Sequence, residues 1–325
     1  MRRFILFLPI LFVACGKPTP PVFAGIVFDV GGIDDKSFNE SAHKGLMKAK
    51  ADLGIEVEYY QPSQPADRKT GMRRLCGKKA SVIVGVGFIF TDEIVAAARD
   101  FPDLKFACVD MIPVADPPKN LCGLNFREEQ GAFLVGAIAG LCTKSKKVGF
   151  VGGMNVPLIH KFEAGFRAGV KHVAADVEVL VNYAGETPKA FEDPETGKSM
   201  ALGQYKSGAD IIFHASGKTG IGVFQAAKET GKLAIGVDAD QHREAPGHVL
   251  TSMIKRVDVA VFDTIKAAKD GTFQGGTRVF GLKEEGVGFV YDDNNKKLIP
   301  EEVYKKAMDL RQQIIDGKIT VPEKK

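Results

Sequence analysis

The sequence predicts an α/β protein of two lobes, each a parallel sheet flanked by helices. Short apolar runs alternate with segments of helical periodicity along most of the chain. A polar run at Lys144–Lys147 interrupts this alternation, which then restarts. Once a leader segment is set aside, about 300 of the 325 residues remain, which is enough for two domains of ordinary size.

Residues 1–14 are expected to be a signal peptide. Two arginines precede a nearly unbroken apolar run, Phe4–Val13, which is too short to span a bilayer as a helix. Cys15 follows a small residue, and this ending resembles the lipobox of bacterial lipoproteins, with Phe12 where an aliphatic residue is usual. We therefore expect lipidation at Cys15 and a Pro-rich tether over 15–22. A plain secretory signal is the alternative.

The first series of elements starts from the stretch Gly25–Asn39. The apolar run Ala24–Phe28 predicts a buried strand, and a glycine pair then allows a tight turn into a helix. Asp34 and Ser37 are both suitable N-caps for that helix, which continues to Ala49. The further strands and helices of this series are predicted at Ile55–Tyr60, Ser81–Val86, Thr91–Phe101, Leu104–Val109, Leu121–Phe126 and Glu128–Leu141.

The second series repeats the same alternation after the polar run. Its strands are predicted at Val148–Val151, Val177–Tyr183, Ala209–Phe213, Leu233–Val237 and Val249–Ile254. Its helices are predicted at Pro157–Val173, Asp193–Tyr205, Ile221–Thr230 and Val257–Lys269. The tail is expected to add strands at Thr277–Leu282 and Gly286–Tyr291 and a helix at Pro300–Asp316.

Several common kinds of site are not indicated. The net charge is +4, but the charges are mixed in sign, unlike the clustered Lys and Arg of a nucleic-acid surface. The segments 217–219 and 197–199 end like a P-loop, yet each lacks the leading glycine. No GxGxxG follows a strand, no GxSxG occurs, and the six histidines are dispersed. We expect no cofactor and no metal.

The cysteines beyond Cys15 indicate neither a zinc site nor a redox motif. Cys76, Cys108, Cys122 and Cys142 contain no CxxC pair. A disulfide between Cys108 and Cys122 is left open, because an exported protein permits one.

Charged side chains recur where predicted strands end. Asp29, Asp110, Asp238 and Lys255 each close an apolar run. In open α/β sheets the carboxyl edge is where ligands bind, so two such lobes would place these groups in the cleft between them. Phe38, Asn39, Phe191 and Gly217 lie in the adjoining loops or helix starts and complete the candidate ligand-binding set.

This set suits a ligand that carries a flat ring and several hydroxyl groups. Carboxylates accept hydrogen bonds from hydroxyls, and Lys255 can donate one or pair with Asp238. Phe38 from one lobe and Phe191 from the other would sandwich the ring, a contact worth about 1–3 kcal/mol per base.

At these residues the chain resembles the basic membrane protein (Bmp) family of bacterial substrate-binding lipoproteins, which includes spirochaetal purine-nucleoside receptors. The resemblance covers Ala24 to about Pro322. The segments that carry it are Asp29–Ser41 (DVGGIDDKSFNES), Val148–Gly153 (VGFVGG), Phe162–Val173 (FEAGFRAGVKHV), His214–Gly231 (HASGKTGIGVFQAAKETG), Ile235–Gln241 (IGVDADQ) and Val249–Phe262 (VLTSMIKRVDVAVF).

The resemblance implies a type I periplasmic-binding fold with lobes joined by crossing strands. One lobe would comprise 23–145 and about 256–275, and the other 146–255 and about 276–322. It also implies capture of a nucleoside for the permease and ATPase subunits of an ABC importer, at the cell envelope and without catalysis.

The family motifs place ligand-binding roles on Asp29, Phe38, Asn39, Asp110, Asp238 and Lys255. The second aromatic falls on Phe191, with Phe213 as the alternative, because Ala184–Pro194 carries extra residues before Phe191. His214 stands where a small residue is usual, which predicts a change in ligand preference. The alternatives are a sugar receptor, a surface adhesin, and a nucleoside hydrolase with Asp29 or Asp238 as general base.

Overall fold

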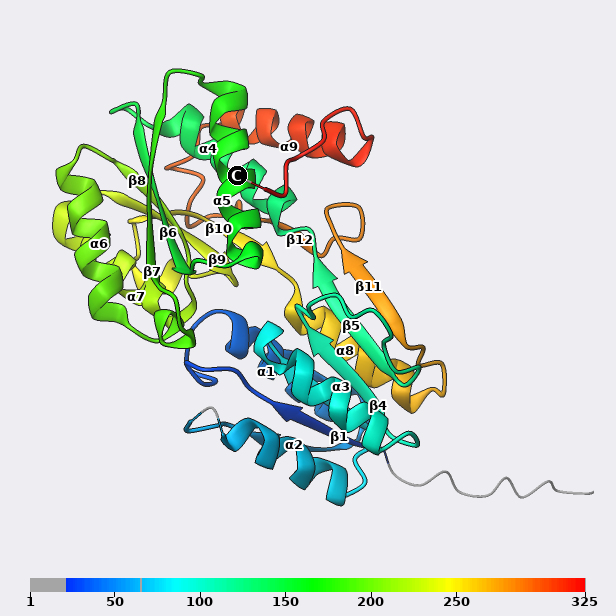
Figure 1. Ribbon diagram of the computed structural model, residues 1–325. Helices are drawn as coiled ribbons and strands as arrows, with labels where there is room; N and C mark the ends of the chain where they lie inside the picture. The colour runs from blue at the N-terminus through cyan, green and yellow to red at the C-terminus, as the bar shows by residue number, and fades with distance from the viewer. Residues whose placement is uncertain (1–21, 65, 325) are drawn as a thin grey trace, which may run out of the picture.

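The computed structural model describes residues 22–64 and 66–324, so the expected signal peptide and the expected lipidation site, Cys15, lie outside the described residues. Two α/β lobes lie side by side (Figure 1), which confirms the predicted fold class. Each lobe contains one six-stranded sheet, with strand orders β11-β5-β4-β3-β1-β2 and β12-β10-β9-β8-β6-β7.

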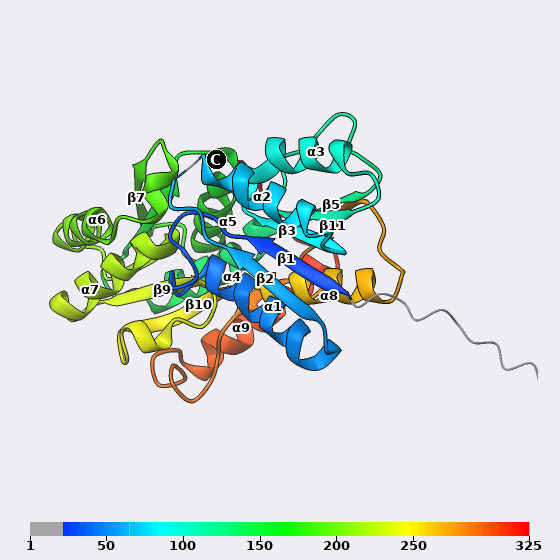
Figure 2. The same ribbon diagram turned by 90° about the horizontal axis from the view of Figure 1, so that it is seen from below.

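The first lobe is a wholly parallel sheet covered by helices on both faces. Helices α1 and α8 pack together on one face, and α2 and α3 lie on the other (Figure 2). Its elements are β1 (Phe23–Val27), α1 (Phe38–Leu53), β2 (Glu56–Tyr60), α2 (Asp67–Gly77), β3 (Val82–Val86), α3 (Thr91–Asp100), β4 (Lys105–Val109), β5 (Leu121–Phe126), α8 (Val257–Lys269) and β11 (Gly276–Phe280).

The second lobe repeats the layers, with one antiparallel strand, β12, at the edge of its sheet. Helices α4, α5 and α9 pack on one face, and α6 and α7 on the other (Figure 1). Its elements are α4 (Glu128–Cys142), β6 (Lys147–Met154), α5 (Pro157–Val173), β7 (Glu178–Gly185), α6 (Pro194–Lys206), β8 (Ile211–Ala215), α7 (Gly220–Thr230), β9 (Leu233–Asp238), β10 (Val249–Lys255), β12 (Val287–Phe289) and α9 (Glu301–Ile315).

The predicted lobe boundaries are wrong at two places. The chain first passes to the second lobe at Arg127, not near 145, because α4 packs on α5, α9 and the second sheet. It returns at Arg256, and β11 still pairs with β5 of the first sheet, so the last passage follows 280 rather than 275. The segments that cross between the lobes are hydrogen-bonded to one another. The backbone N–H of Arg127 donates to Phe280 O at 3.0 Å, and that of Arg256 donates to Gly286 O at 2.8 Å.

The Cys108–Cys122 disulfide is excluded, and both thiols are free and buried. In the β4–β5 register Cys108 faces Gly123, and Cys122 faces Ala107. Because side chains alternate along a strand, the two thiols point to opposite faces of the sheet. Among the described helices, none has the length and apolar character that crossing a bilayer requires.

Candidate functional site

A cavity lies between the lobes, where the carboxyl edges of the two sheets meet. The ends of β1, β3 and β4 line it from the first lobe, and the ends of β8, β9 and β10 from the second. The lining includes all the candidate ligand-binding residues: Asp29, Phe38, Asn39, Asp110, Phe191, Gly217, Asp238 and Lys255.

Asp35 organises the loop between β1 and α1. Its buried carboxylate accepts hydrogen bonds from the backbone N–H groups of Ser37 and Asn39, both at 2.9 Å. Asn39 Oδ1 in turn accepts the backbone N–H of Asp29 at 3.0 Å. The sequence predicted Asp34 or Ser37 as the N-cap. Ser37 does occupy the N-cap position of α1, but its side chain makes no capping hydrogen bond. The Asp35 carboxylate instead accepts the free N–H groups at the start of the helix, and it holds the loop from which Asp29 and Asn39 reach the cavity wall.

The three aspartates at strand ends are buried acceptors. Asp110 and Asp238 have left-handed backbone, with φ of 58° and 66°, which turns the chain at the cleft and costs energy for a residue with a Cβ. Burial raises the pKa of Asp29 and of Asp238 to about 7. Burial also raises the pKa of Asp110 to about 6, against the opposing effect of Lys255. Asp110 Oδ1 has no hydrogen-bond partner, so it is free to accept one from a ligand.

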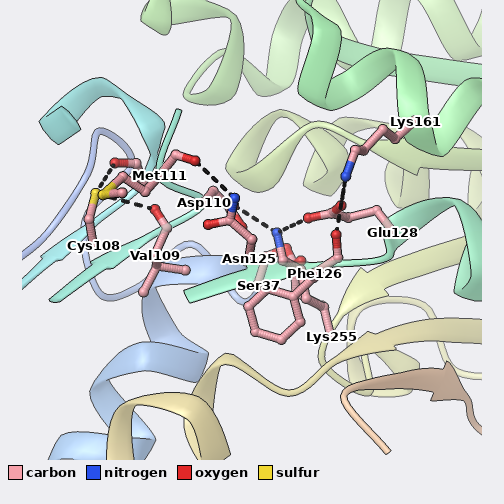
Figure 3. Close-up of polar contacts among 12 residues, drawn as sticks. Ser37, Cys108, Val109, Asp110, Met111, Asn125, Phe126, Glu128, Lys161 and Lys255 are labelled. Atoms are coloured by element: carbon pink, nitrogen blue, oxygen red, sulfur yellow. Dashed lines mark hydrogen bonds and ion pairs between the residues drawn. The ribbon is translucent and has the colours of Figure 1, made fainter. Parts of the chain in front are cut away.

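Lys255 is the cation of the cavity wall, and it is almost completely buried. Its Nζ lies 2.7 Å from Asp110 Oδ2 and 3.0 Å from Glu128 Oε1 (Figure 3). Lys161 approaches the other oxygen of Glu128 at 3.4 Å. Burial alone would lower the pKa of Lys255, but the surrounding carboxylates raise it, so the ammonium is charged. The Nζ is also 5.1 Å from the ring centre of Phe38.

The two phenylalanines that the sequence placed in the candidate set both line the cavity, one from each lobe. Phe38 is the first residue of α1, and Phe191 ends a short 3-10 turn before α6. The ring of Phe191 fits because residue 153 is glycine: a Cβ there would lie 2.2 Å from that ring. Phe213 does not line the cavity, and packs in the core 5.3 Å from the ring of Phe166.

The sequence did not indicate part of the lining. Phe88 follows β3 and lies where the strand-end rule would have placed it. Leu158, Ile159 and Phe162 come from the start of α5, which a rule based on strand ends does not cover. His214, expected to change ligand preference, is buried and does not line the cavity.

The raised pKa of Asp29 predicts a pH-dependent stability. Between about pH 4 and 7 the folded protein keeps this proton while the unfolded chain has lost it, so stability falls as pH rises through that range. The free energy of unfolding of the wild type should therefore decrease between pH 5 and pH 8. We expect this decrease to be about 2 kcal/mol smaller in Asp29→Asn. Urea unfolding at both pH values measures this. Asp34→Asn, at an exposed aspartate in the same loop, is the matched control, and equal pH profiles for wild type and Asp29→Asn would contradict the prediction.

Known proteins are similar to this chain in sequence and in fold. A CD4+ T-cell-stimulating antigen of Listeria monocytogenes is 40% identical over 330 residues, covering 95% of this chain and 90% of the relative. An ABC transporter nucleoside-binding protein, BmpA, of Lactococcus lactis is 36% identical, covering 95% and 91%. The crystal structure of an ABC transporter solute-binding protein from Aeropyrum pernix superimposes with a TM-score of 0.85 at 30% identity, covering 93% and 94%.

The sequence profile of the family described as Bmp, ABC transporter substrate-binding protein PnrA-like, matches residues 23–325, which is nearly all of the chain. The fold and the interlobe cavity agree with that match. The chain belongs to the Bmp family of ABC transporter substrate-binding proteins.

Proposed function

We propose that this protein binds nucleosides between its lobes, with purine nucleosides preferred. The observation that carries the proposal is that one cavity combines a phenylalanine from each lobe with buried acids at three strand ends. In this proposal the base lies between Phe38 and Phe191, and the ribose hydroxyls donate to the strand-end acids, of which Asp110 has an oxygen without a hydrogen-bond partner. The name of the Lactococcus relative supports the same ligand class.

The charges favour an uncharged ligand that donates several hydrogen bonds. Asp29, Asp35, Asp110 and Asp238 line the cavity with Lys255 as the cation among the described lining residues. Each hydroxyl that reaches a carboxylate would contribute about 1.5–3 kcal/mol, the range for hydrogen bonds to charged groups. A sugar without a base would leave both phenylalanine rings uncovered, so a sugar receptor accounts for fewer of these residues.

Calorimetry on protein stripped of endogenous ligand tests the proposal. We expect inosine, guanosine and adenosine to bind in the micromolar range or tighter, about −8 kcal/mol or more favourable. Thymidine and cytidine should bind more weakly because their single rings cover less of the phenylalanine faces. The absence of heat with every nucleoside would overturn the proposal, and release of free base during incubation would favour a hydrolase instead.

We further propose that the protein is anchored through lipid on Cys15 and delivers its ligand to the permease and ATPase subunits of an ABC importer. The family membership and the lipobox-like leader support this. We expect Cys15→Ser to shift the protein from the membrane fraction to the soluble fraction, with ligand affinity unchanged. Radiolabelled palmitate should label the wild type only. Equal membrane retention of the variant would contradict the anchor.

A further inference from the structure

Two hydrogen-bonded contacts join the lobes away from the segments where the chain passes between them. Gln241 Nε2 donates to the backbone oxygen of Lys36 at 3.0 Å. Ser37 Oγ donates to Asp238 Oδ2 and lies 3.4 Å from Val237 O. Lys36 and Ser37 belong to the first lobe, and the other three residues follow or end β9 of the second. Rotation of one lobe against the other about its crossing segments would separate these pairs.

Gln241 is held so that its amide N–H must face the first lobe. The side chain is buried, and Oε1 accepts the backbone N–H of Val237 at 2.7 Å. His214 Nε2 lies 3.0 Å from the same oxygen. Two donors on one end fix that end as the carbonyl, which leaves the NH₂ group directed at Lys36 O.

The neutral His214 supplies the second of those donors in the tautomer that carries its proton on Nε2, with Ser216 Oγ able to donate to Nδ1. It is fully buried, which lowers its pKa to about 4, and Ser216 Oγ lies 3.3 Å from its Nδ1. The imidazole fits because residue 220 is glycine: a Cβ there would lie 2.0 Å from His214 Cε1. The site is therefore built around this histidine.

The receiving carbonyl is presented by strained backbone. Lys36 has φ of 58°, an uncommon conformation for a residue with a Cβ. The Asp35 carboxylate binds the backbone N–H of the next residue, Ser37, and keeps the loop in this shape. Both sides of the contact are thus preorganised, which lowers the entropic cost of forming it.

We propose that Gln241, oriented by His214, is a positioning residue that clasps Lys36 of the opposite lobe and holds the closed form of the protein. Neither Gln241 nor His214 lines the cavity, so the clasp acts on lobe closure and not on ligand contacts. The inference rests on the proposed function only in the choice of a nucleoside as the ligand in its test. A ligand enclosed by both lobes leaves when they open, so loss of the clasp speeds dissociation.

The test replaces the donor without changing the size of the side chain. Gln241→Glu puts a carboxylate against Lys36 O, and Gln241→Met removes the polar group. The matched control is Gln204→Glu: Gln204 is a buried glutamine of the same lobe, but its Nε2 donates to Phe150 O, at 3.0 Å, and to Asn182 Oδ1, both within that lobe. Thermal melts establish that each variant is folded.

Two readouts are measured on the full-length protein. The first is the dissociation rate of tritiated inosine, which we expect to rise about tenfold in both Gln241 variants and to stay within twofold in Gln204→Glu. The second is the interlobe distance distribution without ligand, from spin labels at Lys50→Cys and Lys228→Cys in a Cys142→Ala background. We expect the Gln241 variants to shift this distribution toward longer distances.

Folded Gln241 variants with wild-type dissociation and wild-type distances would overturn the clasp. If the wild type binds no nucleoside, the proposed function fails, but the distance distributions still decide the clasp, because they need no ligand.

Discussion

Replacing Lys255 with methionine is expected to lower the free energy of unfolding by about 3–5 kcal/mol at pH 8, because it leaves buried carboxylates without their cation. Lys255 Nζ lies 2.7 Å from Asp110 Oδ2 and 3.0 Å from Glu128 Oε1, and all three groups are buried. The loss should shrink toward pH 5.5. Asp110 already has a pKa raised to about 6 by burial, and without Lys255 that pKa rises further, so the carboxyl takes up a proton and loses its charge.

Urea unfolding at pH 8 and pH 5.5 measures both effects. Lys161→Met is the matched control, because Lys161 approaches the same Glu128 at 3.4 Å but keeps about a quarter of its side chain exposed. We expect this control to cost about 1 kcal/mol or less. If Lys255→Met and Lys161→Met lose equal free energies of unfolding, the contribution of Lys255 to stability does not depend on its burial.

The charged residues at strand ends could be predicted from the sequence. An aspartate or lysine directly after an apolar strand stands out against its neighbours, and parallel strands place their carboxyl ends on one edge. Asp110, Asp238 and Lys255 were found in this way. Glu128 was not predicted, because acidic residues are common in the first turn of a helix, where they interact favourably with the helix dipole.

Elements that depend on tertiary packing were harder to predict. Helix α2 has the polar sequence DRKTGMRRLCG and buries mainly Met72, Leu75 and Cys76, so its periodicity is weak, and the sequence did not indicate it. The assignment of α4 failed for the opposite reason. It is apolar on nearly all sides because it lies beneath α5 and α9, and composition alone does not say which sheet such a helix covers.

Side chains that act across the cleft were invisible in the sequence. Asp35 and Gln241 are ordinary polar residues in polar loops, and only the fold brings Gln241 to Lys36, 205 positions earlier in the chain. His214 drew attention as an unusual residue, but the expected effect was on the ligand. The structure instead buries it behind Gln241, where its ring nitrogen orients an amide.

Removing the phenylalanine rings should have the largest effect on affinity. We expect Phe38→Ala and Phe191→Ala each to weaken inosine binding by about 1–3 kcal/mol, and the double variant to bring binding close to the limit of calorimetric detection. The structural basis is that the two rings line one cavity from opposite lobes, so a base enclosed by closure meets both. We also expect Phe38→Ala to lower the free energy of unfolding of the ligand-free protein more than Phe191→Ala does. The ring of Phe38 lies 5.1 Å from the Lys255 ammonium and stabilises that buried charge.

The leucine variants distinguish stacking from simple apolar burial. Phe38→Leu and Phe191→Leu keep an apolar side chain but lose the flat face, so we expect them to recover folding stability while losing most of the same affinity. Calorimetry with inosine and with ribose completes the design, because ribose has no base and its binding should be nearly insensitive to both rings. Leucine variants with wild-type affinity for inosine would mean that the phenylalanines close the cavity without holding the ring of the ligand, and the base would then have to be recognised by the polar groups at the strand ends alone.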